Sequence, residues 1–526
     1  MNRRFIEAMM AACITMMWSG CCPKKVLWKD KPKPMEPPVV VEPEDLAPPK
    51  PMPDRTGLPK PTVAKAWAPP AVNRWKMSNG MTVWHLKQSQ APLISLTVLL
   101  PNGSASDPKK KAGTTALMVD MVDEGAGGLS ALQLGEAWQR LATDYSSGTA
   151  VDFAYFSLDM LADTLKPSLA LLAKVLRQPT FAKTEFSRRK SQMSQAALAA
   201  EASPSTGRSH VLRTVLSNNG YAGVSPNGTK SSVGRVSLRD VKKQFKAIVQ
   251  PDGAHVIVVG DVGRAALETA FEAAFGDWKG TPKPRLLPVI GTPLERGIHM
   301  VDYPGASQSA IAVARRVGAW NAKDEVSKHL MNRVLGGMFT SRLNMNLREE
   351  KGYSYGAGSA FVRRKLAGVW LAYAGVKADT TAASLKEIRG EIEGIAGGPR
   401  PITPKEFAVA KGGLVASFPG RFETFANVTN QLVPLARHGL PLDWLQRWPQ
   451  RIESTTLEAA SIQARKLLPK PKEIGGKTTD FWDHFVIVVA GPRQRIEASL
   501  KEFGLPIFPY DAEGKRLKRW DPPATP

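Results

Sequence analysis

Apolar residues along the chain follow two different spacings, and the change from one to the other predicts where strands and helices lie. Alternating or uniformly apolar runs of a few residues indicate strands, whereas recurrence every three to four residues indicates amphipathic helices. In the first half we predict strands at 75–86, 93–100, 150–161 and 255–260, with a hairpin turn at Asn79-Gly80. The helices predicted there are 111–124, 131–142, long stretches to about 217, and 264–275.

The second half of the chain repeats this plan. Its predicted strands are 297–303, 309–315, 369–375 and 485–491, and its predicted helices include 323–335, 341–350 and several that precede the last strand. Each half therefore begins with strands, continues through paired helices and ends with an apolar strand and a helix. This duplication predicts an α+β fold of two similar domains joined near the proline-marked stretch 279–293.

The N-terminus has the features of an export signal. Arg3 and Arg4 precede an apolar stretch that is too short to remain as a membrane anchor, so residues 1–20 are predicted to be a signal peptide. Ser19-Gly20 before Cys21 resembles a bacterial lipobox, which would make Cys21 a lipidated N-terminus, and Cys22 is not the aspartate associated with inner-membrane retention. We therefore expect an outer-membrane lipoprotein that faces the periplasm; a plain secretory signal, giving a periplasmic protein, is the alternative.

The region after the signal is rich in proline and lysine and shows no apolar period. We interpret residues 21–70 as a lipidated N-terminus followed by an extended tether. The predicted domains that follow are 71–285 and 286–515, with a basic and proline-containing tail at 516–526.

Composition narrows the range of reactions and ligands to be expected of this chain. The three cysteines all lie in the leader, so the folded part has no thiol for a disulfide, a nucleophile or a metal ligand. Lys and Arg number 71 against 47 Asp and Glu, a net charge of +24, which favours anionic lipids, polyanions or acidic peptides as partners. Because no basic stripe with interleaved aromatic residues and no zinc-finger spacing is present, nucleic-acid binding is not predicted.

Several segments, in order, resemble parts of the pitrilysin (insulinase) family of zinc peptidases, in its two-domain branch of bacterial and mitochondrial-processing-peptidase-like members. The most specific is LGGMFTSRLNMNLREEKGYSYGAGSAF, and others include KKAGTTALMVDMVDEGA and ITPKEFAVAKGGLVASFPGRFET. The resemblance implies two homologous domains, each a twisted, mostly antiparallel sheet with packed helices. It also implies a chamber around an unfolded peptide, built from four domains, in which one chain often carries the zinc and its partner does not.

The zinc motif of that family is degenerate in this chain. Active members carry histidine-x-x-glutamate-histidine on a helix, where two imidazoles bind zinc and the glutamate is the general base. By resemblance, Ala116 and Asp120 occupy the histidine positions and Val119 the glutamate position, and a third ligand would fall near Gln195 or Ala196. No histidine pair stands at helical metal spacing elsewhere, and an acidic helix face explains Asp120 with its acidic neighbours better than a weak cation site does. We predict no metal or cofactor in this chain and no catalytic residue; zinc is expected on a partner.

Two side chains of the second domain match the family's arginine and tyrosine. By resemblance, Arg348 and Tyr355 would bind substrate by donating hydrogen bonds to a carbonyl oxygen of the bound peptide. The structural alternative is an arginine at a helix C-terminus and a tyrosine that packs as a strand residue.

Together these features favour a non-catalytic subunit that binds unfolded peptides and partners a zinc-bearing homologue, with a lipid anchor holding it to the membrane. The rival hypothesis is a non-enzymatic envelope scaffold or binding protein with the same fold. A third possibility, a self-sufficient peptidase with another metal site, would need ligands that the sequence does not offer.

Overall fold

The computed structural model describes residues 67–217, 220–223, 225–289, 295–468, 473–474 and 477–520. These residues belong to one unit, Trp67–Pro526, which is described here by itself. The predicted signal peptide, the lipidation site Cys21 and most of the tether lie outside the described residues. In the part of the chain that is described, no helix has the length and apolar character needed to cross a membrane.

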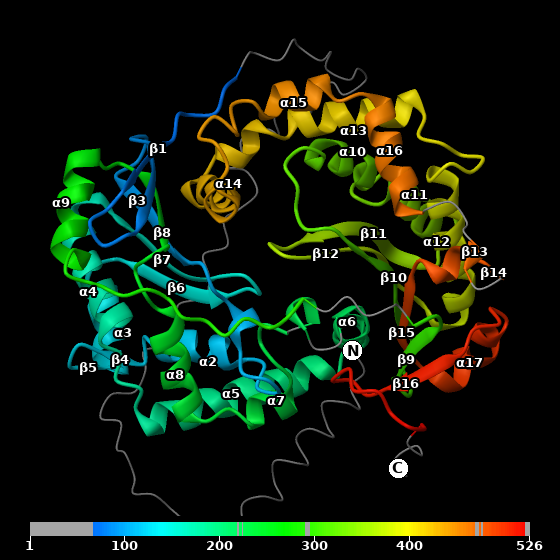
Figure 1. Cartoon of the computed structure of the whole chain (residues 1–526), viewed down its shortest axis with the longest axis horizontal. Coiled ribbons are helices and arrows are strands. Elements are labelled where there is room, and N and C mark those ends of the chain that lie inside the picture. Colours follow the sequence, from blue (N-terminus) through cyan, green and yellow to red (C-terminus); the bar gives the residue numbers. More distant parts are fainter. Residues whose placement is uncertain are drawn as a thin grey trace, which may run out of the picture. The chain divides into compact units, whose positions relative to one another are not determined.

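The first half is built on a six-stranded sheet (Figure 1). Its strand order is β1-β2-β8-β3-β7-β6, and all neighbours are antiparallel except β2 and β8. The turn between β1 and β2 contains Gly80 with φ +93°, a left-handed conformation that glycine adopts without strain. The strands are β1 (Asn73–Lys76), β2 (Thr82–Lys87), β3 (Leu93–Leu100), β6 (Asp144–Thr149), β7 (Ala154–Leu161) and β8 (His255–Gly260).

The second half contains a sheet of nearly the same topology. In the order β16-β9-β15-β10-β12-β11, strands β9, β15, β10, β12 and β11 correspond to β2, β8, β3, β7 and β6, including the parallel pair β9 and β15. The sixth strand differs, since β16 pairs in parallel with β9 whereas β1 pairs antiparallel with β2. The strands are β9 (Ile298–Asp302), β10 (Gln308–Val317), β11 (Ser354–Arg363), β12 (Gly368–Lys377), β15 (Val486–Gly491) and β16 (Ile507–Tyr510).

Helices cover both sheets, and short strand pairs lie outside them. The helices of the first half are α2 (Thr114–Met121), α3 (Ala131–Arg140), α4 (Leu165–Arg177), α5 (Lys183–Glu201), α6 (Pro204–Ser217), α7 (Lys230–Gly234), α8 (Leu238–Ile248) and α9 (Arg264–Phe275). Those of the second half are α10 (Glu325–Leu335), α11 (Arg342–Asn344), a π-helical turn at Met345–Glu350, α12 (Thr381–Ile395), α13 (Pro404–Ala416), α14 (Phe425–His438), α15 (Trp448–Ser454), α16 (Leu457–Leu467) and α17 (Arg493–Lys501). The short pairs are β4 (Gly125–Ala126) with β5 (Leu129–Ser130) and β13 (Glu473–Ile474) with β14 (Lys477–Thr478).

Side chains alternate between the two faces of each sheet, and both faces are apolar. In β8, Val256 and Val258 pack into the core beneath the helices of the first half, whereas Ile257 and Val259 belong to the core on the opposite face. A sheet with two apolar faces needs a cover on each side, because exposed apolar area is unfavourable in water.

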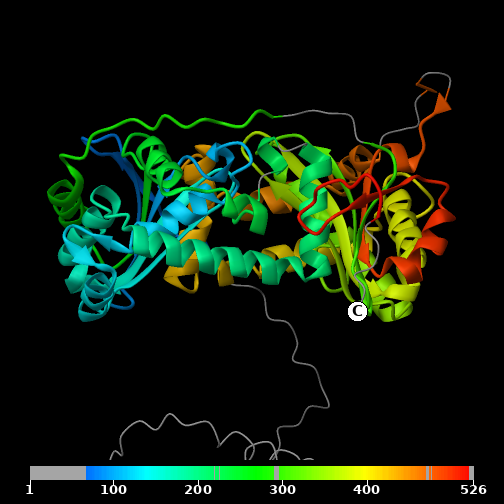
Figure 2. The same cartoon turned by 90° about the horizontal axis from the view of Figure 1, so that it is seen from below.

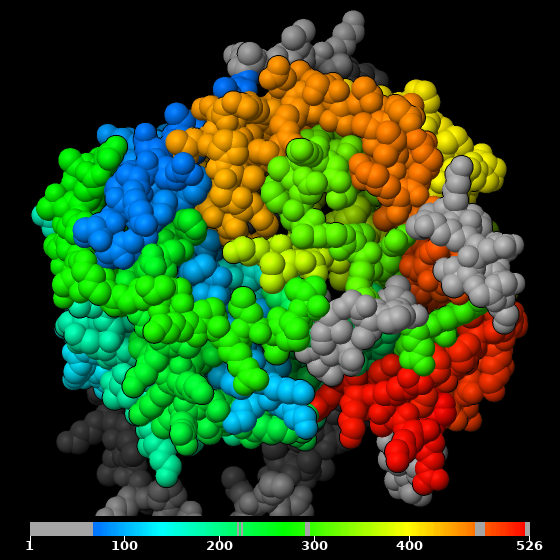
Figure 3. Space-filling view, in the orientation of Figure 1, coloured from blue at the N-terminus to red at the C-terminus, as the bar shows by residue number. Residues whose placement is uncertain are grey.

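The two halves exchange one helix each. Helix α14 of the second half lies on β3 and β8 of the first sheet, and α6 of the first half lies on β9, β10 and β15 of the second sheet (Figure 1). Val211, Leu212 and Leu216 of α6 enter the core of the second sheet, each burial contributing about 2 kcal/mol. In the space-filling view the residues around α14 (orange) lie directly against the first strands of the chain (blue) (Figure 3).

The predicted fold class is confirmed: the chain is α+β, with two mostly antiparallel sheets and their packed helices. Segment 279–289 is an extended connection, green in Figure 2, and its Leu287 amide donates to the carbonyl of Ala105 in the first half. The boundaries 71–285 and 286–515 stay predictions, to which the structure adds the exchanged helices. The prediction missed three strands of the two large sheets, β6, β11 and β16, and the short pairs β4 with β5 and β13 with β14.

Candidate functional site

A cavity of about 800 Å³ opens beside the helix that carries the degenerate zinc motif. Helices α2, α5 and α6, strands β6 and β7, and the loop around 225–228 line it. Strand β6 stands at the edge of the first sheet, with β7 as its neighbour on one side, so a row of its backbone amides and carbonyls has no partner strand. The cavity therefore has a strand edge on one wall and helices on the others.

Helix α2 is fixed at its start by a buried carboxylate. Asp107 accepts hydrogen bonds from the amides of Gly113 and Thr115, both at 2.8 Å, and from the Thr115 hydroxyl at 2.5 Å. Burial raises the pKa of Asp107 to about 7, although these hydrogen bonds oppose the shift. Gln244 of α8 donates to the Thr115 hydroxyl at 2.9 Å, which ties the same turn to a second helix.

The residues at the degenerate zinc positions do not fit zinc. Ala116 and Asp120 line the cavity, but only Asp120 carries a ligand atom, and Val119 is fully buried in the core. Ala196 of α5 also lines the cavity and offers only a methyl group, whereas Gln195 is exposed outside it. Among the described residues no group of three or more His, Cys, Asp or Glu is placed to hold a metal ion. Metal-dependent chemistry therefore has no ligand set in the described part of this chain.

Two arginines of α5 pair with the glutamate that follows α2. Glu124, whose side chain is 6% exposed, forms ion pairs with Arg188 and Arg189 of α5. Burial raises the pKa of Asp123 to about 6, reinforced by the charge of Glu124, and burial also raises the pKa of Asp120, which Arg189 opposes. The ion pairs hold α5 against α2 and compete with any cation for Glu124.

In the second half, Arg348 and Tyr355 are both accessible. Arg348 lies in the π-helical turn Met345–Glu350, where its guanidinium is 4.9 Å from the centre of the Phe339 ring and pairs with Glu349 at 3.1 Å. Tyr355 is 87% exposed and lies where the register of β11 on β12 shifts, between Ser354 and Ala357. The exposed Tyr355 hydroxyl, and the guanidinium donors of Arg348 other than the one that meets Glu349, are accessible to a ligand.

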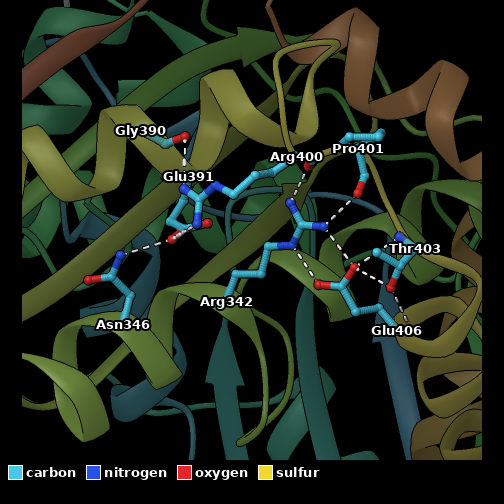
Figure 4. Close-up of polar contacts among 8 residues, drawn as sticks. All are labelled: Arg342, Asn346, Gly390, Glu391, Arg400, Pro401, Thr403 and Glu406. Atoms are coloured by element: carbon cyan, nitrogen blue, oxygen red, sulfur yellow. Dashed lines mark hydrogen bonds and ion pairs between the residues drawn. The ribbon is translucent and has the colours of Figure 1, made fainter.

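A polar network fixes the segment that carries Arg348 (Figure 4). Arg342, six residues before it, forms a two-pronged pair with Glu406 at 2.6 and 2.7 Å and donates to the carbonyls of Arg400 and Pro401. Burial acts to raise the pKa of Glu406, but the bonds from Arg342 and Thr403 lower it to about 2.

The next turn of the segment is held by a second carboxylate. The Asn346 amide donates to Glu391 at 2.8 Å, and Arg400 pairs with the same carboxylate at 3.1 Å (Figure 4). Because these contacts hold the residues just before Arg348, the start of its turn has a rigid support.

Comparisons with known proteins agree with this architecture. Residues 83–225 match the family model described as insulinase (peptidase family M16), and residues 235–414 match the one described as the peptidase M16 inactive domain. The chain belongs to peptidase family M16.

Among curated relatives, the chain is similar to "Non-peptidase homolog YmxG" of Helicobacter pylori, 23% identical over 398 residues that cover 72% of this chain and 90% of that protein. It is also similar to "Zinc protease PqqE" of the same organism, 23% identical over 363 residues, covering 67% of this chain and 80% of that protein. This chain is therefore 23% identical both to a relative named as a zinc protease and to one named as a non-peptidase homologue.

Solved structures agree on the fold. A peptidase M16 inactive domain from Pseudomonas fluorescens superposes with a TM-score of 0.72 at 24% identity, covering 80% of this chain and 98% of that one. A protease from Helicobacter pylori gives a TM-score of 0.71 at 20% identity, covering 80% of this chain and 99% of that one.

Residues of α2 that line the cavity were named from the sequence, but those of α6 were not. Arg213 and His210 of α6 also line the cavity. The only sequence signal for them was their position on one helix, three residues apart, which is common on any helix. Their place in the cavity depends on the exchange of α6, which the amphipathic pattern of a single helix does not encode.

Proposed function

We propose that this chain is a non-catalytic, peptide-binding subunit that works with a zinc-bearing M16 homologue in envelope proteolysis. The observation that carries the proposal is the cavity itself: an open strand edge, β6, lines it, while the zinc positions beside it hold an alanine and a single aspartate. An extended peptide would add to β6 as a further strand, through backbone hydrogen bonds that tolerate varied sequences.

Arg348 and Tyr355 support the same role from the second half. Both are exposed donors, and the network around Arg342 and Asn346 holds the turn that carries Arg348. In the complex these donors would stabilise negative charge on the carbonyl oxygen of a peptide whose cleavage depends on the partner's zinc.

The location proposed for this subunit is the periplasmic face of the outer membrane, through lipidated Cys21. The support is the lipobox-like sequence Ser19-Gly20-Cys21 and the proline-rich tether after it. Labelling with a radioactive fatty acid tests this directly: the wild type is expected to incorporate the label, and Cys21→Ala is expected to remain unlabelled and to leave the membrane fraction.

The decisive experiment is purification of the tagged chain from its native envelope, with mass spectrometry of partners, zinc analysis and a peptide-cleavage assay on the same sample. We expect a zinc-bearing M16 homologue to co-purify. Arg348→Ala is expected to lower cleavage by the complex roughly 10- to 100-fold, whereas Arg140→Ala on α3, also an exposed arginine, leaves it unchanged. If the complex that contains Arg348→Ala cleaves the peptide as fast as the wild-type complex, the proposed role of this residue is contradicted.

The second candidate is a binding or scaffold protein of the envelope that has left proteolysis entirely. The observation that favours it is the similarity to a relative named as a non-peptidase homologue. Recovery of a homodimer without zinc, and without a histidine-bearing partner, would select this function over the first.

A further inference from the structure

One wall of the cavity in the first half carries a half-buried cation, Arg213, without a paired carboxylate in the described part of the chain. Arg213 of α6 lines the cavity, and its Nη1 donates to the Ser225 hydroxyl at 3.2 Å. Among the described residues no carboxylate forms an ion pair with it. Burial, reinforced by the nearby Arg364, lowers the pKa of Arg213 to about 10, so the guanidinium is still charged at neutral pH. Because this charge is partly removed from water, an anion that pairs with it would stabilise it.

The other titratable groups of the cavity do not neutralise Arg213. Arg189 of α5 is already paired with Glu124, and His210 of α6 is held neutral because burial lowers its pKa. Asp120 of α2 is the carboxylate that lines the cavity, but its pKa responds to Arg189 and Glu124 and not to Arg213. Arg213 therefore has no paired carboxylate among the described residues that line the cavity.

Hydroxyl groups also line the cavity. Ser147 of β6, Tyr155 of β7 and Thr206 of α6 line the cavity, whereas the hydroxyls of Thr149 and Ser225, which also line it, already donate to the carbonyls of Ala150 and Gly228. A hydroxyl can donate one hydrogen bond, and a guanidinium offers a planar fork that matches the two oxygens of a carboxylate. The Arg213 guanidinium and the hydroxyls that line the cavity are suited to bind a planar anion next to the open edge of β6.

We infer that this cavity is a carboxylate-binding site, with Arg213 as its anchor, and that it selects acidic peptides. The inference rests on the proposed peptide binding along β6 and deepens it by naming the class of substrate. A peptide on this strand edge would place either a glutamate or aspartate side chain or its own C-terminal carboxylate against Arg213. The overall charge of +24 acts in the same direction by attracting acidic chains to the protein.

The test is fluorescence anisotropy of the purified full chain with labelled extended peptides of one sequence. One peptide carries a central glutamate and an amidated C-terminus, the second has glutamine in place of glutamate, and the third is the glutamine peptide with a free C-terminus. We expect a carboxylate-bearing peptide to bind at least 10-fold more tightly than the amidated glutamine peptide, with the preference shrinking as salt is raised. Whether the glutamate or the free terminus gives the preference identifies the source of the carboxylate.

Variants test whether Arg213 causes the preference for carboxylate-bearing peptides. Arg213→Gln is expected to abolish the preference, and Arg213→Lys to retain part of it, because a lysine keeps the charge but not the fork. Arg140→Gln removes the same charge from an exposed position on α3 and is expected to leave the preference intact. Asp120→Asn is expected to tighten binding of the acidic peptide, a gain that mere damage to the fold would not produce.

The outcomes separate this inference from the function on which it rests. Equal binding of all three peptides, or a preference that survives Arg213→Gln, overturns the carboxylate site and leaves peptide binding standing. Binding of none of the peptides overturns both. If Arg213→Gln does not fold, as judged by circular dichroism, a full preference in folded Arg213→Lys counts against the guanidinium fork, and a reduced preference supports it.

Discussion

Gly207 shows how one missing side chain keeps α6 on the sheet of the other half. A Cβ atom built at this position would lie 2.3 Å from the Tyr303 phenol oxygen, and that hydroxyl donates to the carbonyl of Glu201 at 2.8 Å. Tyr303 follows β9, so this contact belongs to the surface where α6 meets the second sheet. Glycine is therefore required here for close packing and not for its backbone conformation.

Gly207→Ala is expected to lower the free energy of unfolding by about 1 to 3 kcal/mol, because the methyl group displaces Tyr303. Gly135→Ala in α3 is the matched control: nothing lies within 4 Å of its added methyl group, and alanine favours the helix, so stability should rise by about 0.5 to 1 kcal/mol. Urea denaturation of both variants measures the difference. Equal effects at the two positions would show that α6 does not pack against Tyr303 in this way.

Asp107 makes the stability of the fold depend on pH. Its pKa in the folded chain is about 7, above the ordinary value of 3.8 that the unfolded chain retains. Between about pH 4 and pH 7 the folded chain therefore binds more protons, so its stability decreases as pH rises, by at most about 1.4 kcal/mol per pH unit.

Asp107→Asn is expected to flatten this part of the stability profile, because an amide has no proton to lose. The measurement is the free energy of unfolding in urea at several pH values between 4 and 7. Asp123 and Asp120 also have raised pKa values, so part of the slope should remain in the variant. A slope identical to that of the wild type would mean that Asp107 ionises normally in the folded chain.

At the scale of elements, Asp152 connects three of them. It lies between β6 and β7, pairs with Arg437 of α14 at 2.9 Å, and accepts from the Lys365 amide between β11 and β12 at 3.0 Å. The two side chains of the ion pair are 6% and 20% exposed, so the pair is shielded from water.

Asp152→Ala is expected to cost about 3 kcal/mol, because it leaves Arg437 with an uncompensated charge. A double-mutant cycle with Arg437→Ala should show that the two losses are not additive, with a coupling energy of at least about 1 kcal/mol. The exposed pair Arg140 and Glu136, treated in the same way, is expected to show almost none. Additive losses for Asp152 and Arg437 would mean that the pair does not join the hairpin to α14.

The sequence predicted the central elements better than the edges. Strands β3 and β8 and helix α9 were predicted with the bounds that the structure has, because long apolar runs and a helical period define them. Strand β6 has the sequence DYSSGT, with no apolar alternation, and is a strand only because β7 lies beside it. Of the residues that line the cavity, Ala116 and Asp120 were named through the resemblance to the zinc motif, whereas Arg213 was not, because only tertiary packing brings it there.

At the scale of the whole unit, the exchange of helices predicts that neither half is stable without the other. A fragment of residues 67–289 would leave Trp84, Leu86, Ile257 and Val259 without the cover that α14 provides. We expect this fragment to bind a hydrophobic dye and to lack a sharp thermal transition, and co-expression with residues 295–520 to restore both. A fragment that melts cooperatively alone would show that α14 is dispensable for the first sheet.

The same exchange sets the order of events during synthesis on a ribosome. The first sheet is complete in sequence at Gly260, but its second apolar face waits for α14, which ends at His438. At the usual rates of translation the ribosome needs roughly 10 to 30 s to add the intervening residues. Through that interval the nascent chain carries an uncovered apolar surface, so its yield in a cell should depend on chaperones that shield this surface until α14 has been synthesised.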